Sequence, residues 1–247
     1  MNVAVGGRSL RLAIGMLTAL RVPPVLTVTP GVATGALLLA PLAVLPLGAL
    51  VAGVVWGGQE LDLPPLAVAF AALALLAVGS RALHLDGLSD VADGLTSSYD
   101  RERSLTVMKS GTAGPAGAAA LVLVLGAQAA GLAGTEPWVA GAAVCASRAA
   151  LWITCCRLAP PAREDGLGVT FTRRVPVLVA LLGWAALAGL AVLVDPVRGP
   201  VTVAVTGSLV AALTWHTVRR FGGVTGDVFG AAIEIALAAL LVGAAGL

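Results

Sequence analysis

Residues 113–134 read AGPAGAAALVLVLGAQAAGLAG and contain no charged side chain. A helix needs about 20 apolar residues to cross the hydrocarbon core of a bilayer. Backbone polar groups at that depth must be satisfied within the segment, so a single stretch of this kind forms a helix. The segment therefore predicts a membrane-spanning helix, and it decides the fold class.

The composition of the whole chain supports the same class. Of its 247 residues, 58% are hydrophobic and 11% are charged. Soluble domains carry about 25% charged residues, so lipid must cover much of this surface. We expect an all-α, polytopic membrane helix bundle that forms one integral membrane domain over residues 1–247. It has about seven transmembrane helices, with six as an alternative, and the candidate spans are Gly31–Val55, Pro65–Ser80, Ala113–Gly134, Pro137–Cys156, Val175–Val194, Val201–Trp215 and Val228–Leu247.

The first 29 residues precede the first candidate span. Arg8 and Arg11 stand before a short apolar stretch over residues 12–20, and Arg21 and Pro23 follow it. A secretory signal peptide would show a small-residue cleavage site at that point. We therefore expect residues 1–29 to be retained as an N-terminal interfacial segment.

The basic residues gather on one side of the spans. Thirteen of the 15 fall in alternate connections, whereas Arg198 lies on the other side and Arg148 lies within a span. The positive-inside rule places the basic side in the cytoplasm. We expect a multi-pass protein of the cell (inner) membrane with a cytoplasmic N-terminus, a cytoplasmic catalytic loop over 81–112 and a second cytoplasmic loop over 157–174. No basic block occurs, which argues against nucleic acid as a partner.

The run HLDGLSDVADG at residues 84–94 carries three closely spaced carboxylates. Asp86, Asp90 and Asp93 stand at i, i+4 and i+7, within an arc of about 60° on one face of a helix. Like charges at this spacing repel one another, and a divalent cation removes that repulsion. Hard oxygen ligands suit Mg²⁺ or Mn²⁺. The sequence therefore predicts a metal site with catalytic aspartates.

Glycines and basic residues accompany the carboxylates. Gly87 and Gly94 lack side chains, so a phosphate or a neighbouring helix could approach them closely. Arg101, Arg103 and Lys109 follow within the same connection and suit the charge of a diphosphate. The competing interpretation of these cations is ordinary anchoring at the membrane surface.

A second candidate region begins at residue 219 with RRFGGVTGD. Gly222, Gly223 and Thr225 lie in glycine-rich backbone before a helix, an arrangement that can cradle an anion. Asp227 and Glu234 are seven residues apart on one helix face, and an acid inside a membrane helix indicates a functional site. We expect all five residues to bind substrate and this face to look toward the aspartate-bearing helix.

Two kinds of residue are interpreted as packing rather than chemistry. His84 falls on the helix face opposite the three aspartates, so we favour packing over metal ligation. Cys145, Cys155 and Cys156 lack partners at metal-ligand spacing and are read as small core residues.

Four stretches in order resemble the cobalamin synthase family, the adenosylcobinamide-GDP ribazoletransferases, which are membrane enzymes of vitamin B12 assembly. The resemblance covers essentially the whole chain. The stretches are LTALRVP at 17–23, HLDGLSDVADGL at 84–95 with DRER at 100–103, REDGLG at 163–168 and GGVTGD at 222–227.

The resemblance implies a reaction and its cofactor. A hydroxyl of α-ribazole or its 5′-phosphate attacks adenosylcobinamide-GDP, GMP leaves, and adenosylcobalamin or its phosphate forms in the last steps of vitamin B12 biosynthesis. One or two Mg²⁺ ions are expected on Asp86, Asp90 and Asp93. One of these three aspartates would also take the proton of the attacking hydroxyl. The sequence does not select which one.

The resemblance also implies the partners. They are the two substrates and the lipid bilayer, with a homo-oligomer or an association with other cobalamin-assembly enzymes left open. The cations of residues 101–109 would bind the GMP phosphate, and the segment 222–227 would contact the nucleotide or the ribazole.

Two other functions remain as alternatives. A CDP-alcohol phosphotransferase of phospholipid synthesis also uses an aspartate-rich helix, but its usual signature has an Ala-Arg pair and two last aspartates four apart. Here the third aspartate follows the second by three residues. An ion-coupled transporter usually places its charges at the bilayer midplane between repeats, and only Glu234 favours that function.

Overall fold

A computed structural model describes residues 3–246, and these residues form fourteen helices and no strand. The predicted all-α class is confirmed. The helices are α1 (Val3–Leu17), α2 (Pro30–Leu38), α3 (Ala40–Ala43), α4 (Leu45–Glu60), α5 (Pro65–Gly79), α6 (Leu83–Ser97), α7 (Arg101–Met108), α8 (Pro115–Ala133), α9 (Pro137–Ser147), α10 (Ala150–Thr154), α11 (Leu167–Phe171), α12 (Val177–Ala191), α13 (Arg198–Phe221) and α14 (Gly226–Ala244).

Several helices are long and apolar enough to cross a membrane. By length and composition within residues 3–246, α8, α13 and α14 qualify alone. Helices α5 and α6 qualify only together and are bent by 93° at the break between them, and α12 is apolar but shorter. A polytopic helical membrane protein is thus confirmed, with three such helices, or four if the bent pair counts as one span. The expectation was about seven transmembrane helices, and fewer helices of residues 3–246 pass this test by themselves.

The predicted span Gly31–Val55 shows why the expected number differs. It is divided among α2, α3 and α4, with breaks at Leu39 and Val44. Pro41 and Pro46 stand in the first turns of α3 and α4. Proline lacks the N–H that would continue the preceding helix, so each one starts a new segment.

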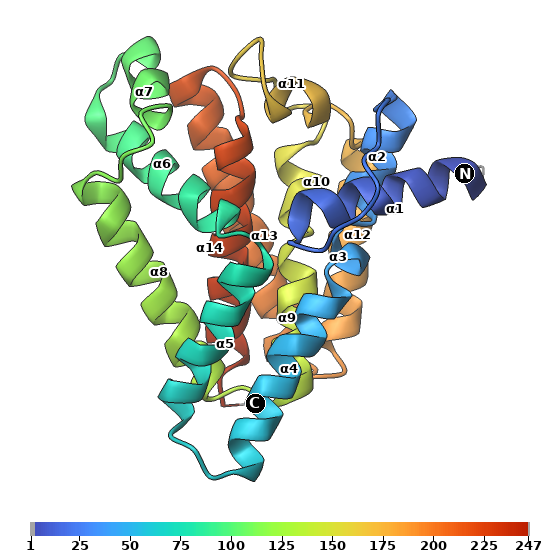
Figure 1. The fold of residues 1–247 in the computed structure, drawn as a ribbon, viewed down its shortest axis with the longest axis vertical. Coiled ribbons are helices and arrows are strands. Elements are labelled where there is room, and N and C mark those ends of the chain that lie inside the picture. Colours follow the sequence, from blue (N-terminus) through green and yellow to red (C-terminus); the bar gives the residue numbers. More distant parts are fainter. Residues whose placement is uncertain (1–2, 247) are drawn as a thin grey trace.

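Helix α14 lies at the centre of the bundle (Figure 1). It packs against α6, α8, α9, α10 and α13. In its candidate span 72% of the residues are buried, against 28% in α8 and α13. Its inward faces carry small residues such as Ala231, Ala232 and Ala236, which allow membrane helices to approach closely.

The N-terminal helix runs across the others. Figure 1 shows α1 lying transverse to the long helices of the bundle, and it packs against α2 and α3. Arg81 ties this region to the end of α5, because its guanidinium donates to the carbonyl of Gly15 at 2.8 Å. The position of residues 1–29 at a membrane surface stays a prediction.

The two long connections and the turn after α13 meet at one end of the molecule. The Arg101 guanidinium donates to the Ala162 carbonyl at 2.8 Å, and the amide of Val224 donates to the Pro160 carbonyl at 2.8 Å. The cytoplasmic connection expected over 81–112 consists largely of the helix that carries the aspartates, α6, and of α7. This end therefore assembles the regions that the sequence singled out.

The close contact of α8 with α14 can be tested through Gly131. A Cβ atom added there would lie 2.7 Å from the backbone carbon of Leu241, so Gly131→Ala should destabilise the protein by about 1–3 kcal/mol. Gly126 on the same helix has nothing within 4 Å of such an atom, and Gly126→Ala serves as the control. Thermal unfolding in detergent measures both, and equal unfolding temperatures would contradict this packing.

Candidate functional site

Helix α6 carries all three predicted aspartates. It begins after Arg81 and Ala82, whose positive φ angles of 60° and 54° break the chain away from α5. Asp86 lies in its first turn, where a carboxylate is favoured by the exposed N–H groups and the helix dipole. The prediction that Asp86, Asp90 and Asp93 share one helix is confirmed.

The three carboxylates have different surroundings. Asp86 is exposed, Asp90 is half-buried and Asp93 is buried. The two oxygens of Asp93 accept hydrogen bonds from the amides of Gly114 at 2.6 Å and Gly117 at 2.9 Å. Asp93 therefore satisfies free N–H groups at the start of α8, and it fastens α6 to that helix.

The expected three-aspartate cluster is not formed. Within residues 3–246 no group of three His, Cys, Asp or Glu side chains is arranged to hold a metal ion. Both oxygens of Asp93 are already engaged by N–H groups at the start of α8. Asp227 adds a further carboxylate to the site, because burial and then the charges of Asp86, Asp227 and Asp93 raise the pKa of the Asp90 carboxyl.

The predicted facing of α6 and α14 is confirmed. A Cβ atom at Gly87 would lie 2.6 Å from the carbonyl oxygen of Asp227, and one at Gly230 would lie 3.0 Å from the Cα of His84. Only glycine permits such close approach. The contact brings the first turn of α14 beside Asp86 and Asp90.

The donor set of this region fits Mg²⁺. Asp86, Asp90 and Asp227 supply carboxylate oxygens, which this ion prefers, and their like charges disfavour one another without a cation. Mg²⁺ is commonly bound by one or two carboxylates together with substrate phosphates rather than by a cage of protein ligands. A full three-carboxylate cluster is therefore not required.

A polar cavity of about 260 Å³ adjoins the N-terminus of α14. Thr225 caps this 19-residue helix, and its hydroxyl also donates to Asp227 at 3.0 Å. Such a helix start favours anions. The cavity is lined by Lys109, Arg163, Asp165, Gly166, Leu167, Gly168, Val224, Thr225, Gly226 and Asp227.

Two cations frame the cavity. Lys109 lies 3.1 Å from Asp165 in an exposed pair, and its hydrogen bond and charge lower the pKa of the Asp165 carboxyl. Arg163 donates to the Leu105 carbonyl at 2.8 Å and lies 4.0 Å from Asp227. Arg163 is thus held close to Asp227, whereas the exposed Lys109 is free to exchange Asp165 for another partner.

Reasoning from sequence did not single out Arg163, which lines the cavity. It stands in the stretch REDGLG at 163–168, which was noted as a resemblance but given no site role. Its relation to Asp227 spans 64 positions of the chain and has no local signature. The available signal was the arginine itself, followed by Gly166 with its positive φ of 80°.

The remaining predicted glycines lie against other parts of the protein. Gly94 faces Met108 of α7, Gly222 ends α13 with φ 75° beneath the Arg101 guanidinium, and Gly223 lies against the backbone of Pro161. These contacts close the turn over the loop 157–166. Direct contact of these glycines with substrate stays a prediction.

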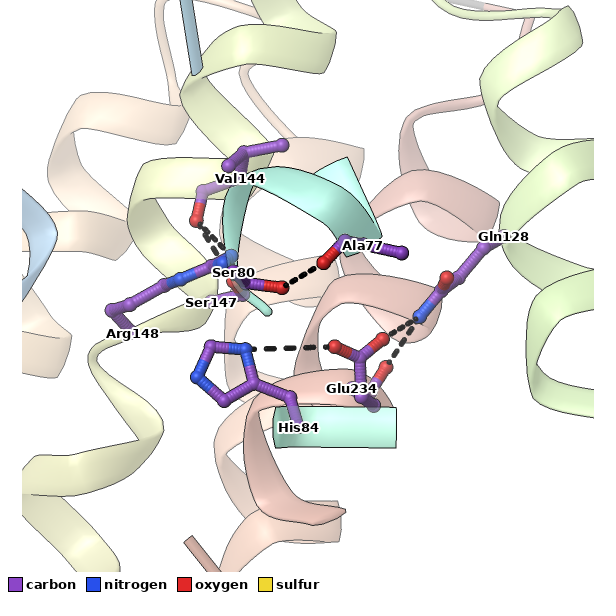
Figure 2. A network of polar contacts seen from close by, with 8 residues as sticks. All are labelled: Ala77, Ser80, His84, Gln128, Val144, Ser147, Arg148 and Glu234. Carbon is purple, nitrogen blue, oxygen red and sulfur yellow. Dashed lines mark hydrogen bonds and ion pairs between the residues drawn. The ribbon is translucent and has the colours of Figure 1, made fainter. Parts of the chain in front are cut away.

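The other cations and Glu234 take separate places. Arg101 is bound to the loop as described, and Arg103 is exposed. Glu234 lies about 10.5 Å along α14 from Asp227 and does not line the cavity. It is buried and accepts a hydrogen bond from Gln128 at 2.7 Å, as Figure 2 shows. The predicted substrate contacts of these three residues are not tested by this geometry.

Comparison with known proteins gives full-length matches. The family model described as cobalamin-5-phosphate synthase (CobS) matches residues 9–245. A relative from Nocardioides sp. named adenosylcobinamide-GDP ribazoletransferase is 55% identical over 233 residues, covering 94% of this chain and 95% of the relative. Relatives of the same name from Roseiflexus sp. and Pseudomonas paraeruginosa are each 37% identical and cover 91% and 95% of this chain and 84% and 96% of their own lengths. No solved structure matches the chain.

The different surroundings of the aspartates predict different effects on stability. In Asp93→Asn an amide NH₂ replaces one acceptor and meets a backbone N–H, so we expect a loss of about 1–3 kcal/mol. Asp86→Asn is the matched control, because Asp86 is exposed and its replacement leaves no buried donor unpaired. Unfolding temperatures of the two variants should differ by several degrees, and equal values would argue against the capping role of Asp93.

Proposed function

Because this chain belongs to the cobalamin-5-phosphate synthase (CobS) family, we propose that it acts as an adenosylcobinamide-GDP ribazoletransferase in the last steps of vitamin B12 biosynthesis. The observation that carries this function is one juxtaposition. The carboxylates of α6 lie beside Asp227, and the cavity at the N-terminus of α14 is framed by Lys109 and Arg163. A diphosphate needs metal-binding acids and anion-binding groups together.

The proposed reaction is a displacement at phosphorus. A hydroxyl of α-ribazole or its 5′-phosphate forms a new P–O bond to the cobinamide-linked phosphorus. The bond from that phosphorus to the bridging oxygen breaks, and GMP leaves with that oxygen. The hydroxyl proton passes to a base of the site. Positioning and charge stabilisation provide most of the catalysis in such reactions.

The aspartates have different roles in this proposal. One or two of Asp86, Asp90 and Asp227, together with the substrate phosphates, would hold Mg²⁺, which when bound supplies positive charge to the diphosphate. Asp86 and Asp90 are the better candidates for proton acceptor, because both oxygens of Asp93 already accept backbone N–H groups. Asp93 acts by holding α6 in place.

The cations and the helix start would receive the phosphate of the leaving GMP. Arg163 presents a planar guanidinium that matches phosphate oxygens, and Lys109 supplies a mobile charge. Thr225 and Gly226 line the same cavity at the N-terminus of α14, where backbone N–H groups favour an anion. The guanine and the ribazole are then held by the surrounding turn and by α11.

The same proposal includes a location. The excess of basic residues on one side of the predicted spans supports an inner-membrane protein with its active site toward the cytoplasm. Arg101, Arg103 and Lys109 of this excess stand in or directly after α7, at the site end of the bundle. Both substrates are polar, and this orientation lets them reach the site from the cytoplasm.

Loss of a metal-binding carboxylate should stop turnover. We expect Asp86→Asn and Asp90→Asn each to lower kcat by about 100-fold or more while the protein stays in the membrane. The assay is Mg²⁺-dependent release of GMP from adenosylcobinamide-GDP with α-ribazole. In a parallel reaction a CDP-alcohol replaces adenosylcobinamide-GDP, and we expect no product from it. Glu60→Gln, an exposed acid at the end of α4, is the control. Full activity in both aspartate variants would refute the metal role.

The guanidinium of Arg163 should contribute to nucleotide binding. Arg163→Ala is expected to raise KM for adenosylcobinamide-GDP by about 10- to 100-fold, because a charge-assisted contact to phosphate is lost. Arg163→Lys keeps the charge without the planar fork and should give an intermediate value. Arg173→Ala changes an exposed arginine outside the cavity and should leave KM unchanged. An unaltered KM in Arg163→Ala would remove this residue from the phosphate site.

A further inference from the structure

A second group of polar side chains lies buried away from the cavity, and Figure 2 shows it. Arg148 and Gln128 are 0% exposed, and His84 and Glu234 are 6% exposed. They come from four places in the fold, since His84 is on α6, Gln128 on α8, Glu234 on α14, and Arg148 ends α9. None of them lines the 260 Å³ cavity.

The contacts within this group centre on Glu234. The amide of Gln128 donates to the Glu234 carboxylate at 2.7 Å and to its backbone carbonyl at 3.1 Å. Nδ1 of His84 lies 3.8 Å from the other carboxylate oxygen, which is beyond hydrogen-bond distance. Figure 2 shows the His84 ring in contact with Glu234 and Arg148 in the same group.

Arg148 is only partly satisfied by its neighbours. Its Nη1 donates to the Val144 carbonyl and to the Ser147 hydroxyl, both at 2.8 Å. Its Nε and Nη2 have no hydrogen-bond partner within residues 3–246. A guanidinium stays charged in a protein, and a buried charge needs a counter-charge nearby.

Glu234 is the available counter-charge. Among the described carboxylates only Asp93 and Glu234 are buried, and Asp93 is engaged by the start of α8. His84 approaches Glu234 at 3.8 Å, and Arg148 belongs to the same buried cluster in Figure 2. The three residues therefore form one buried polar group across α6, α14 and the break after α9.

We propose that Arg148, His84 and Glu234 are positioning residues, whose buried network fixes the rotation of α6 on α14 and so holds Asp86 and Asp90 at the site. This inference rests on the proposed function. Contacts through Gly87 and Gly230 bring the helices together, but a glycine surface does not by itself fix rotation. Polar contacts between buried helices are directional and do so.

The position of His84 links the network to the chemistry. It lies two residues before Asp86 on the same helix, so a rotation of α6 that moves one also moves the other. A shift of about 1 Å in a reacting group can cost about 100-fold in rate. Binding of the nucleotide depends on the cavity residues instead, and these lie on α11, α14 and the loops.

The test compares Arg148→Met, Glu234→Gln and the double variant. Each single change leaves an uncompensated buried polar partner and should lower kcat by about 100-fold, with KM for adenosylcobinamide-GDP changed by less than about threefold. The double variant removes both charges and should recover kcat to within about tenfold of wild type. Thr206→Val, which removes a buried hydroxyl that bonds only within α13, should behave as wild type.

Several results would overturn the network. One is a wild-type kcat in the single variants. Another is a double variant whose decrease in kcat equals the product of the two single decreases. The third is a raised KM with unchanged kcat, which would mean that these residues bind the substrate directly. If the variants of Arg148 and Glu234 do not fold, two variants of His84 provide the test. His84→Ala should lower kcat and His84→Asn, which keeps a donor near Nδ1, should restore most of it, whereas wild-type kcat in both contradicts the proposal.

Failure of the proposed function gives a different pattern. If membranes that contain the wild-type protein show no ribazoletransferase activity, the proposed function is wrong. That result alone does not overturn the network. Coupling between Arg148 and Glu234 is then read from the unfolding temperatures of wild type, the two single variants and the double variant. Additive changes in those temperatures would show that the two charges are independent and would overturn the network on its own.

Discussion

Helix α6 approaches α14 so closely that only glycine fits at the contact, and the site depends on this constraint. Gly87 lies against the backbone of Asp227 and Gly230 against that of His84. A side chain at Gly87 would push the helices apart and separate the carboxylates of α6 from the start of α14, and one at Gly230 would be tightly packed. The cavity with its cations would remain, but the acids that match it would be displaced.

The same contact explains how three similar aspartates come to differ. Asp93 points toward α8 and accepts two backbone N–H groups, while Asp86 and Asp90 face the side of Asp227. Asp93 thus has a structural role, and the proposed chemistry is assigned to the other two. Along α14 a similar division appears, because Asp227 lies at the cavity and Glu234 lies inside the bundle.

Packing also explains what could not be predicted. The aspartate helix and its facing of α14 followed from spacing and from the acids at 227 and 234, and both are confirmed. The bounds of the first span, 31–55, did not show where it divides, and Pro41 and Pro46 start separate helices there. The position of Arg163 beside Asp227 and the burial of Arg148 could not be predicted, because both depend on segments that are distant in the chain.

The sequence by itself determined the membrane class, the helix that carries the aspartates and the relationship to a family, since all three depend on composition and short-range spacing. A run of apolar residues or a seven-residue interval has the same meaning in any fold. The tertiary structure alone decided which carboxylate caps α8, which cation reaches Asp227 and where Glu234 finds its partners. Those choices depend on glycine contacts between distant segments, and such contacts exist only after the helices have packed.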